Sequence, residues 1–284
     1  MNGIEEATIQ LKKALIEPET LAKWETLTSR LALLDSALIA YSGGVDSTFL
    51  SYAAHLALGE KCLAVFIQTE VEAGFQSALA DRWAKQGGFN YVTLTHDALA
   101  DPQFVSNPVN RCYFCKTSIL GLIRKYGDEH GYKTILEGQN LDDQEDYRPG
   151  RQAVKENGAL SPLAEAGLTK SDVRSLAHAL ELPVWNQPSS PCLASRFPYG
   201  LPITPGGLRM VEQGEAYLHS LGFDEVRVRI HQNLARLEVS PQRVLELVAL
   251  GEKVTRAFKD IGFVFVTVDL QGYRQGSLNE GMRP

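Results

Sequence analysis

Residues 37–55 read ALIAYSGGVDSTFLSYAAH, and this stretch decides the fold. It opens with a short apolar run typical of a buried strand and closes with an apolar-periodic run typical of a helix. The small or polar residues between the two runs are Ser42, Gly43, Gly44, Val45, Asp46 and Ser47. A glycine loop at a helix start can bind an anion, because its N–H groups point into one concavity and the helix dipole favours negative charge. We therefore expect residues 42–47, the phosphate loop, to bind a phosphate group.

Further strand-like segments at 62–69, 90–96 and 132–138 alternate with helical patterns. This alternation predicts an α/β fold with a parallel sheet that is covered by helices on both faces. Ligands of such sheets bind in the loops that follow the carboxyl ends of strands. Three candidate ligand-binding segments are expected there, namely the phosphate loop, a loop-like stretch at 97–118 and the segment 138–151.

The pattern changes near residue 200, after an irregular stretch rich in Pro, Gly and Ser. Beyond it, helical and strand-like segments follow one another as α-β-β-α-β. We therefore expect two domains, a nucleotide-binding domain over 1–200 and a smaller domain over 201–284.

The composition is that of a globular protein, with 284 residues, 44% of them hydrophobic, and a formal net charge of -6. The acidic balance speaks against a general nucleic-acid-binding surface. No apolar run approaches the length of a membrane span, and the N-terminus lacks the apolar core of a signal peptide. We therefore expect a protein of the reducing cytoplasm that binds neither nucleic acid nor membrane, in which clustered thiols indicate metal or redox chemistry.

The phosphate loop lacks the Gly-Lys-Ser/Thr of a Walker A loop. The sequence SGGVDS after a buried strand instead resembles the PP-loop of the ATP pyrophosphatases. That resemblance implies binding of ATP and its cleavage between the α and β phosphates. Ser42 and Ser47 add hydroxyl donors, and Asp46 makes sense as a helix cap or as a ligand of nucleotide-bound Mg²⁺. An ordinary glycine turn is the alternative.

Three of the four cysteines fall in chemically suggestive places. Cys112 and Cys115 form a Cys-x-x-Cys pair, Cys192 lies in the proline-flanked PSSPCLASRF, and Cys62 opens a buried-strand pattern. A structural zinc site normally needs four ligands, and a redox dithiol needs only the Cys-x-x-Cys pair. A [4Fe-4S] cluster held by three cysteines would leave one iron open to a further ligand, such as sulfide.

The PP-loop followed by NRCYFCK (110–116), EGQNLDDQEDYRPGR (137–151) and SPCLASRFPYG (190–200) resembles the LarE sulfur transferases over most of the chain. That family acts in making the nickel-pincer nucleotide cofactor of lactate racemase. The resemblance implies that ATP adenylates a carboxylate of pyridinium-3,5-biscarboxylic acid mononucleotide and that sulfur then displaces AMP. One type of LarE sacrifices the sulfur of a single cysteine, and the other binds a [4Fe-4S] cluster through three. Because Cys112, Cys115 and Cys192 are all present, this sequence resembles the cluster type.

The resemblance also implies roles for charged residues. It places Arg196 beside Cys192 and brings Arg227 and Arg229 near the substrate, and alternation along a strand puts the last two on one face. The expected catalytic residues are Cys192, Asp46, Arg196, Arg227 and Arg229. Glu215 and Glu238 are candidate metal or substrate ligands, and Asp143 joins the phosphate loop as a nucleotide ligand. Asp142 orients the nucleotide or caps a helix, and Arg148 and Arg151 are candidate phosphate contacts.

Other functions remain open at this point. A PP-loop tRNA-thiolating enzyme can also use three cysteines, an amidating synthetase would need none, and a nucleotide-binding sensor would do no chemistry. The expected cofactors are ATP, Mg²⁺ and the [4Fe-4S] cluster. The expected partners are a small nucleotide substrate and a sulfur donor, and the resemblance implies a homo-oligomer.

Overall fold

A computed structural model describes residues 3–144, 150–188, 191–274 and 276–282. The chain divides into two compact units. The first comprises Met1–Thr69, Gly74–His96 and Cys112–Ser190, and the second comprises Glu70–Ala73, Asp97–Arg111 and Pro191–Pro284. The expected domains 1–200 and 201–284 stay a prediction.

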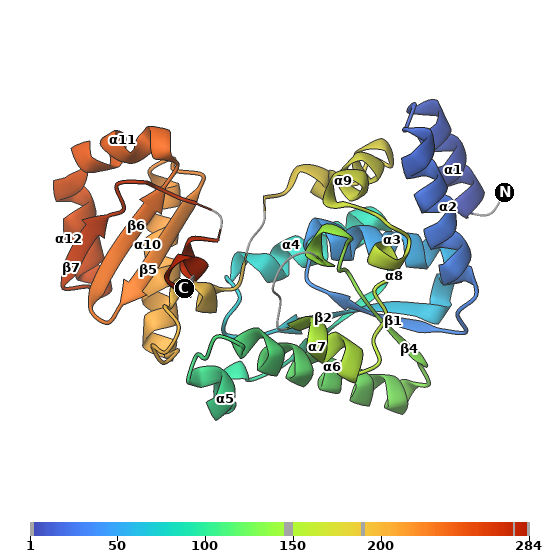
Figure 1. Cartoon of the computed structure of the whole chain (residues 1–284), viewed down its shortest axis with the longest axis horizontal. Coiled ribbons are helices and arrows are strands. Elements are labelled where there is room, and N and C mark those ends of the chain that lie inside the picture. Colours follow the sequence, from blue (N-terminus) through green and yellow to red (C-terminus); the bar gives the residue numbers. More distant parts are fainter. Residues whose placement is uncertain (1–2, 145–149, 189–190, 275, 283–284) are drawn as a thin grey trace. The chain divides into compact units, whose positions relative to one another are not determined.

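The first unit is built on a four-stranded sheet in the order β3-β2-β1-β4, with every neighbouring pair parallel (Figure 1). The strands are β1 (Ala37–Tyr41), β2 (Cys62–Gln68), β3 (Tyr91–Thr95) and β4 (Thr134–Glu137). β1 is central, and Ala37 stands opposite Cys62 on one side and Thr134 on the other. The carboxyl ends of β1 and β4 are therefore neighbours at one edge of the sheet.

Helices cover both faces of this sheet, which confirms the predicted α/β class. They are α1 (Gly3–Lys13), α2 (Pro18–Ala32), α3 (Val45–Leu58), α4 (Phe75–Gly87), α6 (Arg111–His130), α7 (Gly150–Glu156), α8 (Pro162–Glu165) and α9 (Lys170–Ala179). Ile39 belongs to a core shared with Trp24 of α2 and Phe49 of α3, whereas its neighbour Leu38 packs with Leu120 of α6. Successive strand residues point to opposite faces, so β1 separates these two cores.

The loop predicted at 97–118 is only partly a loop. Helix α5 (Pro102–Val105) begins at Pro102, and α6 begins at Arg111. Asp101 caps α5 by accepting a hydrogen bond from the N–H of Gln103. Pro102 lies at the first position of its helix, where the missing N–H costs nothing, so a proline taken as a loop signal marks a helix start. Cys112 and Cys115 therefore lie on a helix and not in a loop.

The second unit contains a three-stranded sheet in the order β5-β6-β7. Its elements are α10 (Pro205–Ser220), β5 (Val226–His231), β6 (Leu234–Val239), α11 (Val244–Ala249), α12 (Gly251–Ile261) and β7 (Phe265–Val268). The expected α-β-β-α-β order holds, except that the last helix is two helices, which meet at Leu250. Val228 of β5 and Phe258 of α12 approach Gly214 of α10, so one face of the sheet packs on these helices.

Among the described helices, none combines the length and apolar character that crossing a membrane requires.

Candidate functional site

The phosphate loop joins a strand to a helix, as the sequence predicts. It runs from the end of β1 at Tyr41 to the start of α3 at Val45. The hydroxyls of Ser42 and Ser47 lie 3.0 Å apart, and the N–H of Ser42 donates to the Ser47 hydroxyl over 3.1 Å. Gly43 has a φ of 72°, which a side chain would disfavour. The first turn of α3 therefore follows a closed loop held by two serines.

Glycine is also required where β4 approaches this loop. Gly138 directly follows β4, and a Cβ there would lie 3.0 Å from the backbone nitrogen of Ser47. That distance is too short for a side chain to fit without moving the backbone. The end of β4 and the start of α3 thus pack backbone against backbone.

Asp46 is held by residues that follow β4. Its carboxylate forms an ion pair with Lys170 and accepts a hydrogen bond from the side-chain amide of Asn140 over 3.3 Å. The N–H of Asn140 in turn donates to Asp143 over 3.2 Å, and the N–H of Lys170 donates to Asp142 over 2.8 Å. The structure therefore brings Asp46, Asp142 and Asp143 to one place beside the phosphate loop.

Of the two candidate arginines in this segment, the structure describes one. Arg151 lies exposed on α7. Arg148 lies outside the described residues.

A buried carboxylate at the end of β4 was not predicted. Glu137 is 1% exposed, and Lys116 of α6 lies 3.3 Å from it. Glu137 also accepts hydrogen bonds from the hydroxyl of Ser161 and from the N–H of Gln139. Because Lys116 directly follows Cys115, this ion pair fixes the first turns of α6 against the sheet.

None of the four cysteines forms a disulfide, and their surroundings differ. Cys112 is exposed, Cys115 and Cys192 are half-buried, and Cys62 is buried. Burial raises the pKa of the Cys62 thiol to about 12, so it stays protonated at neutral pH, as expected of a core thiol. Cys112 and Cys115 belong to the first unit and Cys192 to the second. Within the described ranges, no three His, Cys, Asp or Glu side chains are gathered into a metal site.

Arg196 and Glu215 form a buried ion pair beside Cys192. Nε and Nη2 of Arg196 each lie 2.8 Å from an oxygen of Glu215, which also accepts the N–H of Val228 over 3.0 Å. Nη1 of Arg196 donates to the carbonyls of Pro191 and Cys192 over 2.8 and 3.2 Å. The guanidinium thereby fixes the backbone turn that carries the Cys192 thiol.

A second buried pair joins Arg229 to Glu238. The two groups make two parallel hydrogen bonds of 3.1 and 3.0 Å, and Arg236 donates to the same carboxylate over 2.9 Å. Nη1 of Arg229 reaches the carbonyl of Ser195 over 2.7 Å. Two guanidinium groups therefore fix the turn around Cys192.

The predicted common face of Arg227 and Arg229 is confirmed by the strand register. Arg227 stands opposite Glu238, and Arg229 stands opposite Arg236. We call the three arginines of this set, Arg227, Arg229 and Arg236, the arginine face. Arg227 differs from the two other arginines, since its guanidinium lies 4.8 Å from the ring centre of Tyr273 and no described carboxylate forms an ion pair with it. Burial, together with the nearby Arg196, lowers the pKa of Arg227.

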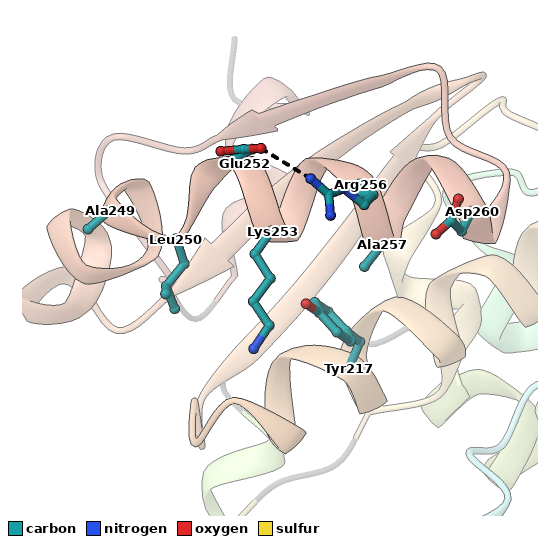
Figure 2. Close-up of a pocket in the computed structure, with 8 residues that line it drawn as sticks. All are labelled: Tyr217, Ala249, Leu250, Glu252, Lys253, Arg256, Ala257 and Asp260. Carbon is teal, nitrogen blue, oxygen red and sulfur yellow. Dashed lines mark hydrogen bonds and ion pairs between the residues drawn. The ribbon is translucent and has the colours of Figure 1, made fainter.

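A separate hollow of about 520 Å³ lies against α10 and α12 (Figure 2). Its polar side chains include an ion pair between Glu252 and Arg256, and Lys253 extends toward Tyr217. None of the predicted site residues lines it. The predicted site residues lie elsewhere, around the phosphate loop in the first unit and around Cys192 in the second.

Known proteins are similar to this chain over most of its length. A protein of Lactiplantibacillus plantarum, named pyridinium-3,5-bisthiocarboxylic acid mononucleotide synthase, is 36% identical over 275 residues, which are 96% of this chain and 96% of that protein. The chain belongs to the LarE family. An uncharacterised protein of Synechocystis is 42% identical over 91% of this chain and 97% of its own length. One of Methanocaldococcus jannaschii is 30% identical over 84% of this chain and 90% of its own length. The scan against protein-family models finds no match.

Family membership confirms that the chain is an enzyme. Residues beside the predicted site that the sequence analysis of this LarE chain did not name are Asn140, Lys170, Glu137 and Tyr273. One signal for Lys170 was present, because Thr169 and Asp172 form a capping box that starts α9. The pairing of Lys170 with Asp46 spans 124 residues, and no local pattern reports such a contact.

Proposed function

We propose that this enzyme is an ATP-dependent sulfur transferase that acts on pyridinium-3,5-biscarboxylic acid mononucleotide. It converts a carboxylate of this nucleotide to a thiocarboxylate, for nickel-pincer nucleotide biosynthesis in the cytoplasm. The observation that carries the proposal is the end-to-end similarity to a synthase named for the bisthiocarboxylic acid product. The phosphate loop and the arginine face are the two parts of the chain suited to anionic ligands.

The first step is adenylation. A carboxylate oxygen of the substrate bonds to the α-phosphorus of ATP, the bond between the α-phosphorus and its bridging oxygen breaks, and pyrophosphate leaves. The phosphate loop would bind ATP through its N–H groups and the hydroxyls of Ser42 and Ser47. Asp46 and Asp143 would hold Mg²⁺, which suits the structure because both carboxylates accept hydrogen bonds from Asn140.

The second step is sulfur transfer. A sulfur nucleophile attacks the carbonyl carbon of the acyl adenylate, the bond from this carbon to the AMP oxygen breaks, and AMP leaves. Carbon changes no oxidation state, so the step needs no oxidant or reductant. Arg227 would bind an anionic group of the substrate, while Arg196 and Arg229 hold the turn around Cys192.

Cys112, Cys115 and Cys192 are the proposed ligands of a [4Fe-4S] cluster. Their thiols fit, because none of the three is in a disulfide or fully buried, whereas Cys62 is shielded in the core. When bound, the cluster would supply an iron with an open position for sulfide. Glu215 and Glu238 remain candidate metal ligands, although both are engaged by arginine.

Iron and acid-labile sulfide content tests the cluster. We expect about four irons per chain in anaerobically reconstituted wild type and loss of iron in Cys112→Ala, Cys115→Ala and Cys192→Ala. Cys62→Ala is the matched control and keeps its iron. A folded wild type that takes up no iron would refute the cluster and turn attention to Cys192 as a sacrificial donor, which loses mass on turnover.

Pyrophosphate release tests the reaction. We expect ATP to yield AMP and pyrophosphate only when the mononucleotide is present. Release triggered by tRNA would instead indicate a tRNA-thiolating enzyme. Turnover with ammonia in the triple Cys→Ser variant would indicate an amidating synthetase, and ATP binding without any release would indicate a sensor.

A further inference from the structure

The residue directly before Cys112 is a buried arginine. Arg111 begins α6 and is 3% exposed, and its Nη1 donates to the side-chain oxygen of Asn107 over 2.9 Å. Its guanidinium carbon lies 4.8 Å from the centre of the Tyr199 ring, and its Nε has no hydrogen-bond partner among the described residues. An amide and a phenol ring carry no net charge, so neither balances the positive charge of the guanidinium.

Asn107 joins Arg111 to the segment that follows Cys192. Asn107 is fully buried, and its side-chain amide donates to two backbone carbonyls of that segment, those of Pro198 and Leu201, over 2.8 and 2.9 Å. The ring that stacks on the guanidinium belongs to the same segment. An amide and a ring therefore hold the residue before one candidate cluster ligand against the chain that follows another.

Arg111 differs from the other buried arginines in lacking a carboxylate. Among the described residues, the arginines less than a tenth exposed are Arg111, Arg196 and Arg229. Arg196 pairs with Glu215 and Arg229 with Glu238, whereas no described carboxylate lies within ion-pair distance of Arg111. A buried guanidinium in this state has lost its hydration without gaining a counter-ion, so an anion bound nearby would stabilise it.

We propose that Arg111 supplies the positive charge that balances the anionic [4Fe-4S] cluster. This inference rests on the proposed function, which gives the cluster three thiolate ligands and a bound sulfide. Three thiolates outweigh the positive charge of the oxidised core, and sulfide adds to the excess, so the occupied site is negative. Arg111 directly precedes Cys112 and contacts the segment that follows Cys192. A buried cation at this place is little screened by salt, so it stabilises the negative site.

Loss of this charge should affect the loaded and the metal-free protein differently. In the loaded protein the cation has an anionic neighbour, so its removal weakens the binding of the cluster. In the metal-free protein the cation is uncompensated, so a neutral side chain there should leave the fold at least as stable as wild type. A residue that served the fold alone would instead destabilise the metal-free protein when replaced.

Arg111→Gln tests this assignment, because it removes the charge and keeps an amide donor for Asn107. After anaerobic reconstitution, the variant should retain iron against a chelator about 10- to 100-fold less tightly than wild type. A redox titration followed by electron paramagnetic resonance should give a lower reduction potential, because loss of a positive charge disfavours the added electron. Urea unfolding should show a metal-free variant that is no less stable than wild type. Arg111→Lys keeps the charge and should keep the reduction potential near that of wild type.

A matched control and a second neutral variant complete the experiment. Arg243 lies in the same unit, 4.2 Å from the ring centre of Phe223, and pairs with Glu246. Arg243→Gln therefore removes another stacked arginine, and it should leave iron retention and the reduction potential unchanged. Arg111→Met replaces Arg111→Gln if the latter fails to fold, because an unbranched apolar side chain suits a buried position.

The outcomes separate this inference from the proposed function. If wild type binds about four irons and the neutral variant holds a cluster of wild-type potential equally tightly, the assignment is wrong and the proposed function stands. If the neutral variant destabilises the metal-free protein and leaves the potential unchanged, Arg111 serves the fold alone. If folded wild type takes up no iron, the proposed cluster fails and the assignment fails with it.

Discussion

Replacing Glu215 with glutamine tests whether the negative charge of this side chain stabilises the fold by balancing the buried guanidinium of Arg196. The exposed fractions of the two side chains are 4% for Arg196 and 11% for Glu215, and two contacts of 2.8 Å join them. Glutamine keeps an acceptor for the N–H of Val228 but removes the charge that balances a buried guanidinium. Breaking a buried ion pair from one side typically costs 3–5 kcal/mol, so we expect Glu215→Gln to lower the free energy of unfolding by about 3 kcal/mol.

Urea unfolding of metal-free protein, followed by far-ultraviolet circular dichroism, measures this change. Glu252→Gln is the matched control, because its pair with Arg256 is exposed at 91% and 75% and should contribute less than about 0.5 kcal/mol. The double variant Arg196→Met/Glu215→Leu should be less destabilised than Glu215→Gln, since it leaves no uncompensated charge. A Glu215→Gln protein as stable as wild type would refute the reasoning.

Three further changes have defined outcomes. Gly138→Ala places a Cβ 3.0 Å from the nitrogen of Ser47, so we expect ATP affinity to fall about 10-fold by calorimetry, and unchanged affinity would contradict the close packing. Lys170→Met leaves the Asp46 carboxylate without its cation, so we expect ATP to bind more weakly to Lys170→Met than to wild type by calorimetry, and Lys170→Arg to bind it as wild type does; equal affinity in all three proteins would contradict this role. Burial raises the pKa of Glu72 from 4.5 to about 7, so its contribution to stability is full below pH 4.5 and is lost as the pH rises through 7. Between pH 5 and 8 the free energy of unfolding of wild type should fall by up to about 3 kcal/mol relative to that of Glu72→Gln. The same difference between the two proteins at both pH values would be evidence against a buried carboxyl.

The parts of the fold that follow local patterns could be predicted from the sequence. The strand, loop and helix of residues 37–55 appear as β1, the phosphate loop and α3, because periodicity and glycine placement are local signals. Strand alternation likewise placed Arg227 and Arg229 on one face, as the register shows. The helix that begins at Pro102 was missed because a proline reads equally well as a loop residue and as the first residue of a helix.

The partners of the charged residues could not be predicted in the same way. Arg196 pairs with Glu215 across 19 residues, and Arg229 pairs with Glu238 across 9. The family resemblance marked both glutamates as candidate ligands, but only packing shows that they lie beside guanidinium groups. Arg227 and Arg229 share a face and a residue type, yet one meets a ring and the other a carboxylate.

We therefore distinguish two kinds of arginine in the second unit, according to the group that lies against the guanidinium. Arg196 and Arg229 each form an ion pair with a glutamate. Their remaining N–H groups donate to the carbonyls of Cys192 and Ser195. A guanidinium that is already paired with a carboxylate on one edge has fewer N–H donors left for an anionic ligand. It can still fix a backbone turn, because the planar group is held rigidly by its ion pair. Arg227 has the opposite arrangement, with a ring on its face and no carboxylate at its edge. The same type of side chain thus holds the backbone where it is paired with a carboxylate, and we propose that it binds an anion where it is stacked on a ring.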